Sequence, residues 1–219
     1  IYPHQAMMLA KWNEVNSFLL VTKTGSGKTA AAALPLIHYR QSGVFVYPTN
    51  ELIKDQVRSI TGLMDREGVS YRILSPENID EKYGRESFHL LAVDAEQLKK
   101  FASVFRMSEK NRAAALVRLM KPERPKIILI NPDLLYLFYS LRYRMAAEIV
   151  AHFQAYQTVV FDEFHLYAGV ELAHILFLIH TAQSLKAFQR VVLLTATPPL
   201  QVRNPVSYTH LTLPTKRIV

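Results

Sequence analysis

Short apolar runs alternate with longer segments of helical periodicity along most of this chain. The apolar runs predict strands at residues 18–22, 44–47, 69–74, 127–130, 158–161 and 191–194. Helical patterns fall between them, at residues 29–39, from residue 50 onward, and at 134–153 and 170–187. Each apolar run is short, as expected of strands that are buried on both faces of a parallel sheet. The alternation predicts an α/β fold, a parallel β-sheet with helices on both faces.

The helix expected after the second strand has a defined start and one apolar face. Asn50 can cap it, because a short polar side chain can bond the free N–H groups of the first turn. The apolar face follows at helical spacing and comprises Leu52, Ile53, Val57, Ile60 and Leu63.

A basic, helix-prone stretch at residues 94–120 is longer than a simple crossover between two strands needs to be. Its cationic side chains could face a phosphate backbone, or they could form a solvated helix face, which is the interpretation we favour. They are Lys99, Lys100, Arg106, Lys110, Arg112 and Arg118.

Composition sets broad limits on the class of protein. The chain has 219 residues, of which 50% are hydrophobic, so it can bury a substantial core in one or two domains. No apolar run approaches the ~18 residues that span a bilayer, and no signal-peptide pattern opens the chain. The sequence has no cysteine, which fits a reducing compartment such as the cytoplasm. The net charge of +8 makes an anionic partner plausible but supports nucleic acid only weakly.

Residues 206–219 differ in character from the rest of the chain. The segment can be back-translated into DNA that resembles the transposase adaptor of sequencing libraries, read through in frame. A genuine strand with alternating threonine and leucine is the alternative. We expect the native domain to occupy residues 1–205, to be cut at both ends and to continue past Pro205 in its gene. Without Lys216 and Arg217 the net charge falls by two, from +8 to +6.

A glycine-rich turn follows the first expected strand and opens a helix. It reads Thr22-Lys23-Thr24-Gly25-Ser26-Gly27-Lys28-Thr29, with Thr22 in place of the first glycine of the general phosphate-loop pattern. Backbone N–H groups in such a turn hold phosphates, and the helix N-terminus adds favourable partial charge. Lys28 would reach the β- and γ-phosphates of ATP, and the Thr29 hydroxyl would hold Mg²⁺.

A second polar segment, Val159-Val160-Phe161-Asp162-Glu163-Phe164-His165, ends a later strand. Asp162 would complete the shell of Mg²⁺, and Glu163 would polarise the attacking water. The ordinary alternative is a plain glycine loop and an acidic pair that caps a helix. That alternative leaves unexplained why both sites follow apolar strands at the same sheet edge.

Four further segments flank these two in a fixed order. Tyr2-Pro3-His4-Gln5 precedes the turn, where a glutamine amide can pair with an adenine edge. Pro48-Thr49-Asn50-Glu51-Leu52 and Asn131-Pro132-Asp133 each follow a strand, where loop groups can contact a sugar-phosphate backbone. Leu194-Thr195-Ala196-Thr197-Pro198 ends the last strand, with two hydroxyls able to hydrogen-bond the acidic pair.

Taken together, these segments resemble the first RecA-like domain of superfamily-two DEAD/DEAH helicases, over residues 2–198. The Thr-Gly-Ser-Gly-Lys-Thr form of the turn is the helicase variant. Three stretches are similar to the CRISPR-associated helicase of the type I-D subtype, which acts on target DNA during interference. They are Tyr47-Pro48-Thr49-Asn50-Glu51-Leu52-Ile53-Lys54-Asp55-Gln56, Asn131-Pro132-Asp133-Leu134-Leu135-Tyr136 and Phe161-Asp162-Glu163-Phe164-His165-Leu166-Tyr167.

The resemblance implies a role for each matching residue. Gln5 would recognise adenine, with Tyr2 able to stack on the base. His165, together with Thr195 and Thr197, would couple the nucleotide state to nucleic-acid binding. The phosphates and Mg²⁺ would be bound by Thr24, Gly25, Ser26, Gly27, Lys28, Thr29 and Asp162, and the strand-binding groove would be lined by Pro48, Thr49, Asn131 and Asp133. Gln5 as a surface residue, His165 as a packed histidine and the threonines as strand-end hydroxyls remain the alternatives.

The same resemblance implies ATP and Mg²⁺ as cofactors and DNA, in particular single-stranded DNA, as partner. RNA and the subunits of a CRISPR effector complex are further partners it allows, and no membrane is implied. Such helicases close two RecA-like domains over one ATP, and the second supplies an arginine worth about 10³–10⁵ in rate. We therefore expect the 219-residue chain alone to bind ATP weakly, to hydrolyse it negligibly and not to unwind DNA.

Other functions stay open at this point. A DNA-repair or restriction helicase would carry similar motifs, and a non-catalytic module could hold ATP and nucleic acid as a scaffold. A P-loop small-molecule kinase has no use for Pro48-Thr49 or for Thr195-Ala196-Thr197. Nuclease activity is unsupported, because the eight histidines include no His-Asp doublet and no spacing suited to a metal cluster.

Overall fold

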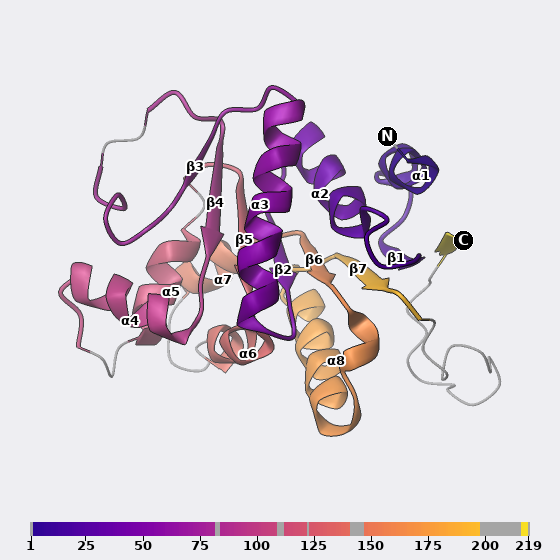
Figure 1. Cartoon of the computed structure of the whole chain (residues 1–219). Helices are drawn as coiled ribbons and strands as arrows, with labels where there is room; N and C mark the ends of the chain where they lie inside the picture. The colour runs from indigo at the N-terminus through magenta and orange to yellow at the C-terminus, as the bar shows by residue number, and fades with distance from the viewer. Residues whose placement is uncertain are drawn as a thin grey trace.

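A parallel β-sheet forms the centre of the computed structural model, which describes residues 2–81, 84–108, 112–121, 123–140, 147–197 and 216–218 (Figure 1). Its strand order is β3-β4-β5-β2-β6-β7-β1-β8, and every neighbouring pair runs parallel. The strands are β1 (Ser17–Val21), β2 (Gly43–Val46), β3 (Tyr71–Ile73), β4 (Phe88–Ala92), β5 (Lys126–Ile130), β6 (Thr158–Phe161), β7 (Arg190–Thr195) and β8 (Lys216–Ile218). The predicted α/β class is confirmed.

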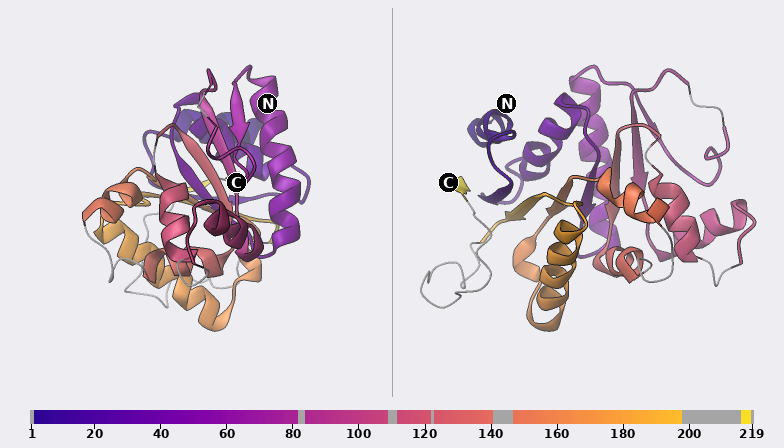
Figure 2. Two further views of the ribbon diagram at one scale, coloured as in Figure 1. Left: turned by 90° about the vertical axis from the view of Figure 1, so that its left-hand side faces the viewer. Right: turned by 180° about the vertical axis from the view of Figure 1, so that it is seen from behind.

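Helices cover the two faces of the sheet in two groups (Figure 2). The first face carries α1 (Pro3–Lys11), α2 (Lys28–His38) and α3 (Asn50–Arg66). The second carries α4 (Ala95–Val104), α5 (Arg112–Met120), α6 (Pro132–Ser140), α7 (Ala147–Gln154) and α8 (Gly169–Ser184). A short 3₁₀ turn, η3 (Phe164–Leu166), lies between β6 and α8.

Alternation along the strands divides the interior into two cores. Val44 and Val46 of β2 pack with the helices of the second face, while Phe45 packs with those of the first. This follows from the two-residue period of strands, whose successive side chains point to opposite faces. Because both faces are covered, most strand residues are apolar, which is the pattern in the sequence.

The amphipathic helix expected from residue 50 is α3, but its cap differs from the prediction. Thr49 is the N-cap, and its hydroxyl accepts from the Leu52 N–H at 3.4 Å. Asn50 is instead the first helical residue. The predicted apolar face is confirmed, since each of its residues is buried or packs against the first core: Leu52, Ile53, Val57, Ile60 and Leu63.

Three elements differ from the expected pattern. Strand β4 was not predicted, because His89 interrupts its apolar run, and α1 was not predicted as a helix. The single helix expected at residues 134–153 is two helices, α6 and α7, and residues 141–146 between them lie outside the described part. The other strands and helices whose positions were predicted agree to within a few residues.

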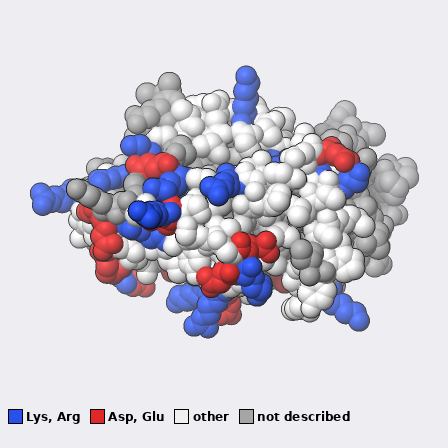
Figure 3. Space-filling model, turned by 90° about the horizontal axis from the view of Figure 1, so that it is seen from above, with Lys and Arg blue, Asp and Glu red and all other residues white. Residues whose placement is uncertain are grey.

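The basic stretch forms α4 and α5, and two of its cations have partners within the protein. Lys100 Nζ lies 2.9 Å from Glu96, and Arg118 lies 3.7 Å from Asp80 with its guanidinium over the Phe105 ring. Figure 3 shows basic and acidic side chains interspersed on one face of the molecule. These contacts favour a solvated helix face over a phosphate-binding one; Lys110 lies outside the described residues.

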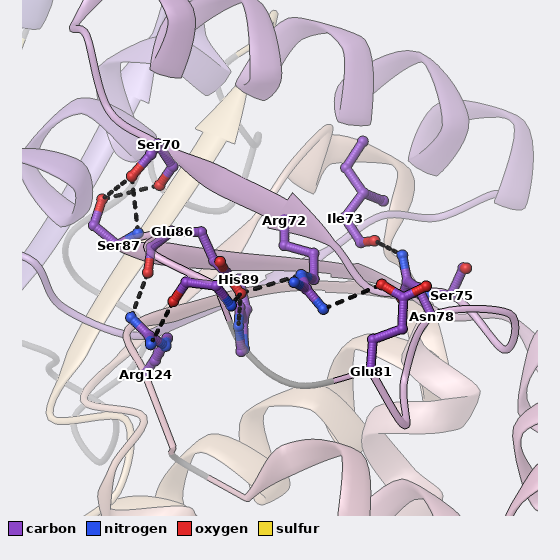
Figure 4. Close-up of polar contacts among 11 residues, drawn as sticks. Ser70, Arg72, Ile73, Ser75, Asn78, Glu81, Glu86, Ser87, His89 and Arg124 are labelled. Carbon is purple, nitrogen blue, oxygen red and sulfur yellow. Dashed lines mark hydrogen bonds and ion pairs between the residues drawn. The ribbon is translucent and has the colours of Figure 1, made fainter.

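A polar cluster ties β3 and β4 to the loop that precedes β5 (Figure 4). Glu86 Oε1 lies 3.1 Å from Arg72 Nε and 3.7 Å from Nε2 of His89, which is fully buried. Arg124 donates to the backbone oxygens of Glu86 and Gly84. Burial lowers the pKa of His89, and the nearby Lys126 charge adds to this effect. The neutral histidine is therefore favoured inside the sheet.

Of residues 206–219 the structure describes only Lys216–Ile218, which pair with β1 at the sheet edge. Such a short pairing fits both a sequencing adaptor that was read through and a genuine strand. The origin of the segment from an adaptor therefore stays a prediction. Pro198 and Pro205 also lie outside the described residues. No helix in the described ranges is both long and apolar enough to cross a membrane.

Candidate nucleotide-binding site and nucleic-acid interface

The glycine-rich turn joins β1 to the N-terminus of α2 at the carboxyl edge of the sheet. Gly25 and Gly27 both adopt left-handed backbone angles, with φ of +77° and +79°. Residues other than glycine rarely adopt this backbone conformation. A Cβ placed on Gly25 would meet nothing within 4 Å, so the turn is open on that side. The first N–H groups of α2 have no partner within the helix, so they are free to bind an anion.

Lys28 is the first residue of α2 and only 6% exposed. Its Nζ donates to the backbone oxygens of Thr22 and Lys23, at 3.3 and 3.5 Å. The same nitrogen lies 3.9 Å from Glu163 Oε1. The ammonium group is thus directed back over the turn, between the phosphate cradle and the acidic segment.

Thr29 and Asp162 join the two predicted halves of the site. The Thr29 hydroxyl donates to Asp162 Oδ2 at 2.8 Å, and the Glu163 N–H donates to Oδ1 at 2.8 Å. Both side chains are buried. Burial raises the pKa of Asp162, while these hydrogen bonds and the Lys28 charge oppose the rise. Adjacent hydroxyl and carboxylate oxygens are the hard donors that Mg²⁺ prefers, so the residues present fit that ion.

Glu163 has a left-handed backbone, with φ of +46°, which is uncommon outside glycine. His165 Nδ1 lies 3.4 Å from Glu163 Oε2 and 3.1 Å from Thr195 Oγ1. The Thr195 hydroxyl itself donates to the Thr197 carbonyl at 2.6 Å. Because that proton is committed, Thr195 Oγ1 serves as the acceptor in its contact with His165 Nδ1.

The last strand therefore reaches the acidic pair differently from the prediction. Among the described residues, neither Thr195 nor Thr197 bonds Asp162 or Glu163 through its hydroxyl; Thr195 contacts His165, which contacts Glu163. The predicted direct bond is wrong, because the Thr195 hydroxyl closes a turn onto residue 197 instead. The chain of contacts still connects β7 to the acidic segment.

Gln5 is 9% exposed, so it is not an ordinary surface residue. Its amide nitrogen donates to the Gly27 carbonyl at 3.2 Å, and its amide oxygen accepts from the Tyr2 N–H at 2.9 Å. The side chain thus links α1 to the phosphate turn. The Tyr2 ring is exposed and stacks on His4, with centroids 5.7 Å apart.

The two expected nucleic-acid segments follow the neighbouring strands β2 and β5. Asn131 Nδ2 donates to Asn50 Oδ1 at 3.2 Å, which joins the segments, and Asn131 Oδ1 accepts from the Leu134 N–H. Asp133 is exposed. The structure thus brings the Pro48-Thr49 and Asn131-Asp133 segments together, although the Thr49 hydroxyl is occupied as a helix cap.

A cleft of about 530 Å³ begins at Asp133, between α6 and α8. Tyr136 is 55% exposed at this cleft, and its ring stacks on His174 at a centroid distance of 6.1 Å. The cleft is lined by Pro132, Asp133, Tyr136, Val170, Glu171, His174, Ile175 and Leu178. Sequence reasoning missed this pair of rings, although Tyr136 lies one helical turn after Asp133.

The family model described as DEAD/DEAH box helicase matches residues 2–204. The chain belongs to the DEAD/DEAH box helicase family. This domain is similar in structure to the DUF1998 helicase MrfA, with 22% identity and a TM-score of 0.59 over 90% of this chain and 27% of that one. It is also similar to the Pyrococcus furiosus Hef helicase domain, with 22% identity and a TM-score of 0.55 over 98% of this chain and 38% of that one.

A further structure of MrfA, bound to DNA and AMPPNP, is 20% identical to this helicase domain, with a TM-score of 0.58. It is matched over 90% of this chain and 24% of that one, so the domain spans well under half of these structures. No curated protein matches the sequence. Within the described part of this helicase domain, no group of three or more histidine or acidic side chains could hold a metal ion.

Proposed function

We propose that this chain is the ATP-binding domain of an ATP-dependent nucleic-acid helicase or translocase. The observation that carries the proposal is the hydrogen bond from Thr29 to Asp162, with Glu163 beside it. This contact joins the phosphate turn to the acidic pair through two buried side chains, an arrangement that supports nucleotide hydrolysis. Family membership supports the same conclusion.

Each residue of the site has a chemical task in this proposal. Lys28 and the turn from Thr24 to Gly27 bind the phosphates, and Gln5 reads the adenine edge beside Tyr2. Thr29 and Asp162 would hold Mg²⁺, which when bound offsets charge on the phosphates. Glu163 accepts a proton from the attacking water as general base.

Nucleic acid is proposed to bind along the joined ends of β2 and β5. Loop groups of Pro48, Thr49 and Asn131 would contact the sugar-phosphate backbone, which fixes position without reading sequence. Tyr136, stacked on His174 in the adjoining cleft, offers an aromatic face to an unstacked base. Single-stranded DNA fits this arrangement, and single-stranded RNA fits it equally well.

His165 and Thr195 are proposed to couple the two sites. They form a continuous contact from Glu163 to the end of β7. In this proposal, a change at the nucleotide is transmitted through these contacts to the end of β7 and from there alters nucleic-acid binding. An arginine from a second RecA-like domain would complete the hydrolytic site.

We infer a more specific role, in CRISPR interference on target DNA. The inference rests on the amino-acid sequences of the segments at residues 47–56, 131–136 and 161–167. In this role the partners are subunits of an effector complex in the cytoplasm. Isolation of the intact protein from its source tests this: recovery of interference subunits supports the role. Recovery of repair or restriction proteins instead would favour the alternative helicase.

The decisive experiment is Glu163→Gln in the intact protein, with DNA-stimulated release of phosphate as the readout. We expect nucleotide binding to persist and the turnover number to fall by about 10²–10⁴, the usual contribution of a general base. Glu67→Gln, at the exposed end of α3, is the matched control and should leave turnover unchanged. Undiminished hydrolysis by Glu163→Gln would remove Glu163 from its role, and absence of turnover in the unaltered protein would favour a non-catalytic module.

A further inference from the structure

Tyr47 places a buried hydroxyl group at the end of β2, next to the site. Only 1% of the residue is exposed. Its backbone N–H donates to the Ile130 carbonyl at 3.0 Å, and its ring stacks on Phe45 with centroids 6.4 Å apart. Among the residues that the structure describes, none forms a hydrogen bond with the Tyr47 hydroxyl. The ring is fixed in place while its polar atom stays unsatisfied.

The sheet register brings Tyr47 next to Asp162. Val46 pairs with Phe161 between β2 and β6, so the residues that follow, Tyr47 and Asp162, occupy the next position of the two strands. The Asp162 N–H confirms this by donating to the Val46 carbonyl at 3.0 Å. Burial and then the Asp162 charge raise the pKa of Tyr47, and the Thr29 hydroxyl acts in the opposite direction. Tyr47 and Asp162 therefore end neighbouring strands at the same edge of the sheet, where Thr29 bonds Asp162.

A second buried tyrosine, Tyr167, reaches the same end of β2, but its hydroxyl is already bonded there. Its hydroxyl donates to the Val46 carbonyl at 3.3 Å, so its proton is already committed. Burial raises the pKa of Tyr167, and the charges of Glu171 and Asp162 add to the effect. Of these two tyrosines, Tyr47 alone has its hydroxyl proton uncommitted to another described residue.

Packing does not explain a tyrosine at position 47. A buried hydroxyl without a partner is unfavourable, whereas phenylalanine would fill the same space without that cost. Asp162 has acceptor capacity to spare, because its two described hydrogen bonds occupy half of the roughly four lone-pair sites of a carboxylate. An unused donor thus lies beside an unsaturated acceptor.

We propose that Tyr47 is a positioning residue for the magnesium-binding pair, donating its O–H to the Asp162–Thr29 pair when that pair holds the ion of a bound nucleotide. The inference rests on the proposed function, since it needs Thr29 and Asp162 to bind Mg²⁺. Partners of this kind fix the orientation of a ligating carboxylate, and their loss typically lowers metal affinity about 10–100-fold.

The test compares nucleotide affinity with and without Mg²⁺, using a fluorescent, non-hydrolysable ATP analogue and the full chain. The ratio of the two affinities is the magnesium gain. We expect Tyr47→Phe to reduce this gain about tenfold or more while leaving affinity in EDTA unchanged. Tyr156→Phe is the matched control, because Tyr156 is equally buried but its hydroxyl bonds the distant Met120 carbonyl at 2.8 Å. It should keep the full gain.

The outcomes separate the two levels of the proposal. A Tyr47→Phe variant with the magnesium gain of the unaltered chain would overturn the role of Tyr47. An unaltered chain without any magnesium gain would instead overturn the proposed function, and the role of Tyr47 with it. Thermal unfolding without nucleotide shows that the variants fold: Tyr47→Phe should unfold no earlier than the unaltered chain, and Tyr156→Phe should unfold earlier, since it alone loses a hydrogen bond formed in the described structure.

Discussion

The Thr29 hydroxyl donates to Asp162 Oδ2 at 2.8 Å, although the two residues are 133 positions apart in the sequence. Thr29 lies at the start of α2, which follows β1, and Asp162 directly follows β6. Strands β1 and β6 lie on opposite sides of β7 in the sheet. Their contact exists only because parallel strands bring their carboxyl ends to one edge. It joins two separate sequence motifs into one site, on which most of the following predictions depend.

Lys28→Ala is expected to weaken nucleotide binding by about 1.5–3 kcal/mol, the contribution of a hydrogen bond to a charged group. The physical reason is that the buried ammonium is directed at the turn that would cradle the phosphates. Lys23→Ala is the matched control, because it removes the same charge from an exposed position in the same turn. Titration calorimetry with ATP compares them; equal losses would show that net charge, rather than the position of Lys28, governs binding.

Gly27→Ala and Gly25→Ala should separate backbone strain from a lost contact. Both substitutions place a Cβ on a residue with a left-handed backbone, which should destabilise the folded chain by about 1–2 kcal/mol. The added Cβ of the first lies 2.7 Å from Gln5 Nε2, whereas that of the second meets nothing within 4 Å. Gly27→Ala should therefore displace the Gln5 amide and reduce the preference for ATP over GTP. If both variants keep the same preference, Gln5 does not read the base.

His165→Ala should reduce the stimulation of hydrolysis by single-stranded DNA more than it reduces basal hydrolysis. The imidazole is the contact between Glu163 and Thr195, so its removal separates β7 from the acidic segment. His180→Ala, on the exposed side of α8, is the control. Steady-state rates of the intact protein with and without DNA give the ratio, and a proportional fall in both rates would argue against coupling.

Stability should rise with pH between about 8 and 10 because of Lys126. Burial lowers the pKa of Lys126 from 10.5 to about 8. In this window the unfolded chain binds the proton that the folded chain has released, so the free energy of unfolding increases. The increase should be about 2 kcal/mol larger than in Lys126→Met. Urea unfolding at a series of pH values measures it, and parallel curves for the two proteins would contradict it.

Local sequence patterns were sufficient to predict most of the fold and the residues that make up the candidate site. The apolar runs at residues 127–130 and 158–161 match β5 and β6 closely, because strands covered on both faces consist mainly of apolar residues. The order of motifs along the chain supplied Lys28, Thr29 and Asp162 as neighbours. These are features that short windows of sequence contain.

Features that depend on tertiary partners could not be predicted. Strand β4 was missed because a buried His89 breaks its apolar run, and its burial depends on Glu86 and the loop before β5. The choice of Thr49 over Asn50 as cap depends on Asn131, which engages the Asn50 side chain. Likewise Lys126 is buried because the backbone oxygens of Leu119 and Lys121 accept from its ammonium, and no sequence window contains that geometry.

The position of β1 in the sheet has a consequence for how this chain is made. Residues 17–21 pair with residues 191–195, so the strand that leads into the phosphate turn has its inner neighbour almost at the far end of the sheet's sequence. A ribosome releases the turn long before β7 exists to hold it. Until residues 191–195 have been synthesised, β1 therefore lacks its inner neighbour in the sheet. The strand that leads into the phosphate turn is then fixed in the sheet only after this long-range pairing with β7 has formed.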